Sequence, residues 1–172
     1  MSCLISLKGI PYACEVNLSG IKNLWLADWN EIGVTVDDST GTISTITGLD
    51  VFEKFAFAKN TGSLTKTMTK DDSKGTRYFL NEVTANFNRM DKDKRKVLNA
   101  LAAGQIAAIV EDMNHIYWYL GKDNYATATA VTGQTGAATD DGNFYVLTIQ
   151  DMSGELPYSI DASALTGLID AK

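Results

Sequence analysis

Residues 52–90 read FEKFAFAKNTGSLTKTMTKDDSKGTRYFLNEVTANFNRM, and the fold that we expect follows mainly from them. Its two halves, 52–69 and 76–90, are rich in Thr and aromatic residues, which favour β-strands. Residues 70–75 between them, KDDSKG, have the composition of a turn. The stretch therefore predicts one β-hairpin whose arms are far longer than the usual strand of about 5–6 residues.

The two ends of this hairpin differ in polarity. Near its base, apolar residues alternate with others, as in strands packed on a core: Phe52, Phe55, Phe57, Val83, Ala85 and Phe87. Between Thr61 and Arg77 the large apolar residues are Leu64 and Met68, and most other positions hold Thr, Lys or Gly. An isolated two-stranded ribbon is only marginally stable in water. We therefore predict that residues 61–77 form a protruding hairpin tip, which a partner outside the fold completes.

The rest of the chain predicts shorter elements around the hairpin. Strands are expected at 13–18, 22–28, 32–36, 42–47, 105–112, 116–121, 126–132, 143–150 and 155–160. One helix is expected between an Asp91 cap and a Gly104 stop, with Val97, Leu98 and Leu101 on its apolar face, and a weak helix is expected at 162–168. The predicted fold class is mainly β: a β-sandwich or partly closed barrel with one flanking helix and a long protruding β-hairpin.

Length and composition predict one domain over residues 1–172, with residues 1–12 as an N-terminal arm. The 172 residues are 45% apolar and 21% charged, which is enough apolar material for one core. The net charge of −6 argues against a protein that binds nucleic acid through its phosphates. The N-terminus lacks a secretory signal and no run approaches the ~20 apolar residues of a membrane span, so we expect a cytoplasmic protein with no membrane partner unless an assembly carries it out.

Charge is distributed unevenly along the chain. Residues 61–77 hold four Lys or Arg and two Asp, a net +2, so the other 155 residues carry −8. Thr-rich strands with an open edge can pair with a neighbouring copy, and opposite charge on that copy would select the register. A contact in which each copy donates its tip to the next closes into a ring when the rotation permits. The predicted interface residues are Leu64, Lys66, Met68, Lys70, Lys74 and Arg77.

Residue types that usually perform catalysis or bind metals are scarce. The chain has one His and two Cys, and we expect Cys3 and Cys14 to be reduced, buried thiols. His115 is interpreted as a turn residue with a local hydrogen bond. The acidic pairs 37–38, 71–72 and 140–141 lack EF-hand spacing and are interpreted as turn chemistry. No enzymatic activity, metal or cofactor is therefore expected.

The order of elements, with hairpin 52–90, helix 91–103 and strand pairs up to residue 150, resembles that of tail tube proteins of long-tailed bacteriophages. Related ring-forming proteins occur in contractile secretion systems. Residues 132–149, TGQTGAATDDGNFYVLTI, and 14–22, CEVNLSGIK, are similar to virion proteins of phages of Bacteroides-type bacteria. The resemblance implies a virion location after assembly in the host cytoplasm. It also implies stacked rings, commonly hexameric, contacts with other virion proteins, and a conduit through which DNA passes without specific binding.

Other functions are compatible with the same residues. A tail hub, a connector ring or a capsid-associated protein can share the predicted sandwich. A monomeric carbohydrate-binding module would use Trp29, which follows a strand end, and Tyr side chains as stacking surfaces. An enzyme built on Asp and Glu alone is the third alternative.

Overall fold

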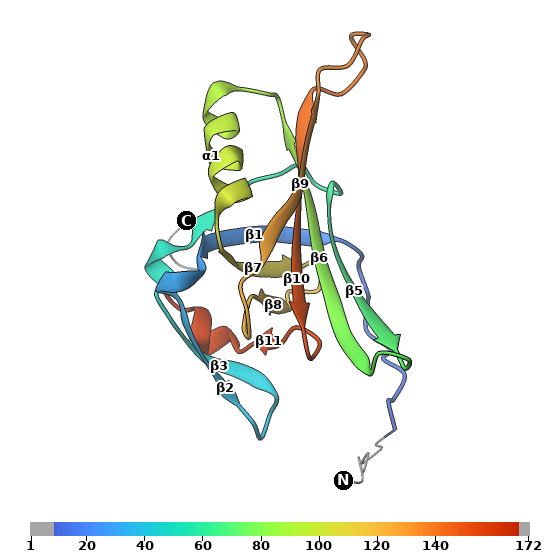
Figure 1. Cartoon of the computed structure of the whole chain (residues 1–172), viewed down its shortest axis with the longest axis vertical. Coiled ribbons are helices and arrows are strands. Elements are labelled where there is room, and N and C mark those ends of the chain that lie inside the picture. Colours follow the sequence, from blue (N-terminus) through green and yellow to red (C-terminus); the bar gives the residue numbers. More distant parts are fainter. Residues whose placement is uncertain (1–8, 169–172) are drawn as a thin grey trace.

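Two sheets and one helix make up the computed structural model, which describes residues 9–168 (Figure 1). The larger sheet has the strand order β2 (Gly33–Asp37), β3 (Thr42–Thr47), β11 (Ser159–Ile160), β8 (Tyr117–Leu120), β7 (Ile106–Asp112), β1 (Ile21–Asp28) and β4 (Glu53–Lys54). The smaller sheet has the order β5 (Gly62–Asp71), β6 (Thr76–Asn88), β10 (Phe144–Ser153) and β9 (Thr127–Gln134). Paired strands are antiparallel except β11 and β3. The predicted mainly β, sandwich-like fold with one helix is confirmed, and within residues 9–168 neither sheet closes into a barrel.

The principal core lies between the two sheets, whose strands cross steeply (Figure 1). Val83 and Ala85 of β6 and Ile149 of β10 are buried against Leu24 of β1 and Val110 of β7. Strands β6 and β10 alternate in burial because successive side chains point to opposite faces. This alternation confirms that the base of the predicted hairpin packs on a core.

A second core lies on the other face of the larger sheet. Trp25, Ile109 and Tyr119 are buried there with Ile43 of β3 and Leu165 of the short 3-10 helix η3 (Ala162–Leu165). Strand β7 contributes to both cores and is buried on both faces, as its unbroken apolar run predicts. The predicted weak helix at 162–168 is thus only a 3-10 turn.

The first arm of the predicted hairpin is divided between the two sheets, so the prediction of one strand from residue 52 to 69 was wrong. Glu53 and Lys54 form β4, which pairs with β1, and the Phe55 N–H donates to the Leu24 carbonyl at 2.8 Å. The chain then crosses to the smaller sheet and enters β5 at Gly62. The division follows from packing, because Phe52 is buried in the second core whereas Phe55 packs against the first.

Helix α1 (Lys92–Ala103) has the predicted ends. The Asp91 carboxylate accepts hydrogen bonds from the N–H groups of Asp93 at 3.0 Å and Lys94 at 2.8 Å, and Gly104 follows the last turn. Leu98 is buried in the principal core, whereas Val97, predicted to share its apolar face, remains 45% exposed. The helix therefore leaves part of its apolar side uncovered.

The segment before β1 forms no strand, so the strand predicted at 13–18 was wrong. The described residues 9–18 are all exposed and contribute to neither sheet. A strand needs a partner for its backbone groups, and no strand of the described chain pairs with this segment. Cys14 is an exposed free thiol, which corrects the expectation of burial, and Cys3 lies outside the described residues.

Candidate subunit interface

The β5–β6 hairpin has a supported part and a free end. Strand β6 pairs with β10 from Asn88 to Phe79, and with β5 from Ala85 to Thr76. Beyond Phe79 the hairpin has two strands only, so residues 69–78 extend past the edge of the four-stranded sheet (Figure 1). This free end comprises the turn and its flanking polar residues.

The six predicted interface residues lie in two different environments. Leu64 and Lys66 are half-buried and face the domain itself, with Leu64 packed against the principal core. The other four, Met68, Lys70, Lys74 and Arg77, are exposed. Four of the predicted residues therefore lie on the accessible part of the hairpin. Leu64 and Lys66 instead attach β5 to the body.

Lys66 makes the most specific of these attachments. Its Nζ lies 2.9 Å from the centroid of the Trp118 ring, and the Trp118 Nε1–H donates to Asp112 Oδ2 at 3.0 Å. Burial lowers the pKa of Lys66 to about 8, although the nearby Asp112 carboxylate has the opposite effect. The lowered pKa means that the loss of hydration disfavours the charged form of Lys66 more than the Asp112 carboxylate favours it.

The turn at the free end is organised by its own side chains. Asp71 Oδ1 accepts hydrogen bonds from the Ser73 N–H at 3.0 Å and the Ser73 hydroxyl at 2.6 Å, which holds the pKa of Asp71 below its usual value. Lys70 pairs with Asp72 at 2.7 Å and Lys74 with Asp71 at 3.4 Å. Arg77 has no ion pair within residues 9–168. The net charge of +2 therefore remains, with Arg77 as the accessible cation available to a partner.

The opposite edge of the same sheet also lacks a further strand within residues 9–168, although α1 packs beside it, and we did not predict this edge from the sequence. Strand β9 is the last strand of the order β5-β6-β10-β9, and its residues 129–134 are exposed. The loop 135–143 continues beyond it, at the other end of the molecule from the β5–β6 turn (Figure 1). In sequence, Thr127–Gln134 contains small and Thr residues with Val131 as its one large apolar residue, and that pattern could have marked an exposed edge.

Trp29, on which the carbohydrate alternative depends, is partly buried and not fully exposed. Trp29, in the short 3-10 helix η1 (Trp29–Glu31), is half-buried against the second core. Its Nε1–H donates to the Gly121 carbonyl at 2.5 Å, and its ring meets Tyr125 edge-on at 6.0 Å. The indole N–H is therefore satisfied within the domain, and only part of the ring is exposed.

The residues considered for catalysis and cation binding serve the turns. His115 has a left-handed backbone with φ of 63°, and its Nδ1 lies 2.8 Å from Glu111 Oε1, which confirms its interpretation as a turn residue. Asp37 and Asp141 accept hydrogen bonds from N–H groups of their own loops, which confirms the same interpretation for the acidic pairs that contain them. Among residues 9–168, no group of three or more His, Cys, Asp or Glu side chains is placed to hold a metal ion. No helix in this range is long and apolar enough to cross a membrane.

Comparisons with known proteins provide little beyond this geometry. No protein-family model matches the chain, and no curated protein matches it. A chain of a solved structure described as the virion of a native gene transfer agent particle is similar at 12% identity and a TM-score of 0.37, over 77% of this chain and 97% of that chain. A likeness that weak carries no functional weight, so the function is inferred from the surfaces described above.

Proposed function

We propose that this protein is a non-enzymatic virion structural protein, and specifically a tail tube subunit that assembles into stacked rings. The proposal rests on one observation: within residues 9–168 the four-stranded sheet ends on opposite sides in β5 and β9, neither of which pairs with a further strand, and α1 packs beside part of β9. An open edge presents backbone N–H and C=O groups that a neighbouring strand can satisfy. Pairing β5 of one copy with β9 of the next continues the sheet from copy to copy and repeats head to tail, which closes into a ring at a suitable rotation.

The charge distribution supports the same arrangement. Residues 61–77 carry +2 and the remainder of the chain carries −8, so the hairpin of one copy is attracted to the body of the next. An acidic inner surface would repel the phosphates of DNA and limit its adhesion, as a conduit requires. The resemblance in element order to tail tube proteins favours this assembly over a tail hub, a connector ring or a capsid-associated protein.

The experiment that tests the proposal shortens the hairpin without disturbing the core. Thr67 and Leu80 lie opposite each other, so residues 68–79 can be replaced by an Asn-Gly turn. We expect a folded monomer that no longer forms rings, measured by light scattering and negative-stain microscopy. The matched control replaces residues 38–41 of the β2–β3 loop with the same turn and should assemble normally. Rings formed by the shortened protein would refute the assignment of the hairpin to the interface.

A further inference from the structure

The segment before β1 carries an apolar face that no other described residue of the chain covers. Ile10, Tyr12, Val16 and Leu18 are 96%, 91%, 82% and 50% exposed, and Cys14 between them is exposed too. These five residues occupy every second position, so an extended chain places them on one side. The segment 10–18, called the arm below, therefore has the pattern of a half-buried strand without the burial.

The arm is attached to the body at one end only. The Leu18 N–H donates to Asn114 Oδ1 at 2.8 Å, and Asn114 Nδ2 donates to the Leu18 carbonyl at 3.1 Å and to Asn17 Oδ1 at 3.0 Å. From there the arm leaves the body beside the β5–β6 turn and points away from the rest of the molecule (Figure 1). Extended over nine residues, it spans about 30 Å.

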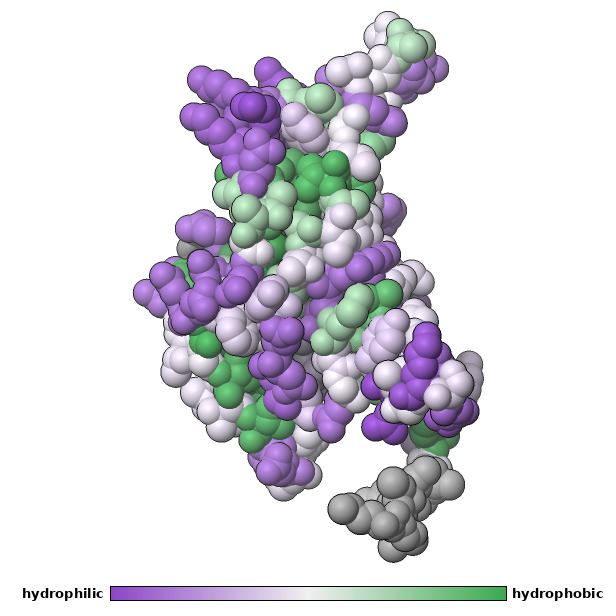
Figure 2. Space-filling view, viewed as in Figure 1, coloured by the Kyte–Doolittle hydropathy of each residue, from purple (hydrophilic) through white to green (hydrophobic). Residues whose placement is uncertain are grey.

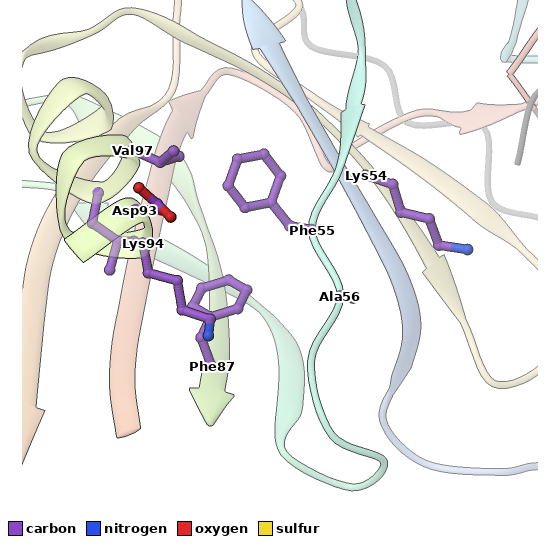
Figure 3. Close-up of a pocket in the computed structure, with 8 residues that line it drawn as sticks. Lys54, Phe55, Ala56, Phe87, Asp93, Lys94 and Val97 are labelled. Atoms are coloured by element: carbon purple, nitrogen blue, oxygen red, sulfur yellow. The ribbon is translucent and has the colours of Figure 1, made fainter. Parts of the chain in front are cut away.

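An apolar groove lies beside α1, at the other end of the long axis. Two adjoining hollows of about 360 and 330 Å³ share Phe55 and Val97 on their walls, and Phe87, Leu98 and Leu101 contribute to one or the other. The Phe55 ring lies between Val97 of α1 and the Phe87 ring, which it meets edge-on at 6.1 Å (Figure 3). Figure 2 shows hydrophobic residues gathered beside the charged outer side of α1.

We propose that the arm of one copy binds in this groove of a second copy. The alternating apolar side chains of the arm match an apolar groove in chemistry, and burying both removes two exposed hydrophobic surfaces from water. The arm and the groove lie at opposite ends of the molecule, so the arm reaches another copy rather than its own groove (Figure 1). The contact is head to tail along the long axis. The inference rests on the proposed self-assembly but does not involve the β5–β6 turn.

The native thiol of Cys14 provides a direct test, because it lies on the apolar side of the arm. In a Cys3→Ser background, Ala100→Cys places a second thiol on the groove wall and Asn99→Cys places one on the opposite side of α1. Each variant is oxidised, or treated with a bismaleimide, at a concentration where the protein assembles. Docking raises the effective thiol concentration, so we expect about fivefold or more dimer and higher species from Ala100→Cys than from the control.

A second pair of variants tests the apolar face itself. Adding Tyr12→Asp to Ala100→Cys should reduce the cross-link to the control level, whereas adding Ala13→Asp on the other side of the arm should not. Equal yields from Ala100→Cys and Asn99→Cys would overturn the proposal, as would a product linked within one chain. Rings that form without the cross-link would refute the arm contact alone. The cross-link is also measured in the protein with the shortened hairpin. If that protein still forms rings and still cross-links, the role proposed for the hairpin is refuted and the arm contact is not.

Discussion

The ammonium nitrogen of Lys66 lies 2.9 Å from the centroid of the Trp118 ring and thereby joins the edge strand β5 to β8 of the other sheet. Leu64, two residues earlier on the same side of β5, packs against the principal core. The supported part of the hairpin is thus held by side chains as well as by β6. Beyond these two contacts the hairpin is free to meet a partner.

The Lys66 contact predicts different effects for two substitutions. Because desolvation of the charge lowers its pKa, we expect the apolar stem to provide most of the stabilisation. We expect Lys66→Met to keep the free energy of unfolding at pH 7 within about 0.5 kcal/mol of wild type, and Lys66→Ala to lower it by about 1 kcal/mol. Urea denaturation measures both. Equal losses in the two variants would show that the charge, and not the stem, holds β5.

The same residue predicts a pH dependence with a definite sign. The pKa of Lys66 is about 8 in the folded protein, below the ordinary value of 10.5. Between these two pH values the unfolded chain binds more protons, so the free energy of unfolding rises with pH. We expect wild type to gain stability relative to Lys66→Met from pH 8 to 10.5. A constant difference between the two proteins across this range would contradict the lowered pKa.

Gly62, where the chain enters β5, has no room for a side chain. A Cβ there would lie 2.6 Å from Ile21 Cγ1 and 2.8 Å from Phe57 Cε2. We expect Gly62→Ala to lower the free energy of unfolding by about 1–3 kcal/mol through overpacking. Gly154→Ala is the control, since no atom lies within 4 Å of its added Cβ. Thermal or urea unfolding measures both variants. Equal free energies of unfolding for Gly62→Ala and Gly154→Ala would contradict the crowding at Gly62.

A buried amide and carboxyl pair predicts a loss of stability as pH rises. Asn81 Nδ2 donates to Asp151 Oδ2 at 3.2 Å, while Asn81 Oδ1 and Asp151 Oδ1 are buried with no hydrogen-bond partner among the described residues. Burial of these atoms favours the neutral, protonated form of Asp151. Burial raises the pKa of Asp151 above its usual 3.8, so its stabilising effect is complete below that pH and is lost as pH rises through the folded value.

Asp151→Asn removes the ionisation at this position and leaves an amide that can donate to Asn81. We expect the variant to gain stability relative to wild type between pH 4 and pH 7, measured by denaturation at each pH. Asp140→Asn, at an exposed loop position, should show no comparable change. A stability difference that does not vary with pH would mean that Asp151 is already ionised at pH 4 in the folded protein.

Arg77 predicts the salt dependence of assembly. As the accessible cation of the hairpin tip, it is available to an acidic neighbour. We expect Arg77→Glu to raise the concentration needed for ring formation roughly tenfold at low salt, and the difference to shrink at high salt as charges are screened. Lys96→Glu on α1 makes the same change in net charge and should have a smaller effect in light scattering. Equal effects would assign the result to net charge alone.

Elements whose ends depend on local chemistry could be predicted from the amino-acid sequence. Asp91 and Gly104 bound α1 because a carboxylate caps the first N–H groups and glycine stops the last turn. The turn after β5 follows from Asp71 and Ser73, which bond to each other across two residues. The unbroken apolar run of β7 predicted burial on both faces. Of the candidate interface, the exposed Met68, Lys70, Lys74 and Arg77 lie where their polar surroundings indicated.

Which strands form and which side chains are exposed depends on contacts between residues far apart in the sequence. The alternation in residues 13–18 resembles that of a strand, but no other strand of the described chain pairs with it. Lys66 and Trp29, both expected to face outward, are held by residues 52 and 92 positions away in sequence. Strand pairing and side-chain burial depend on partners distant in the chain, and the local composition of a segment does not identify those partners.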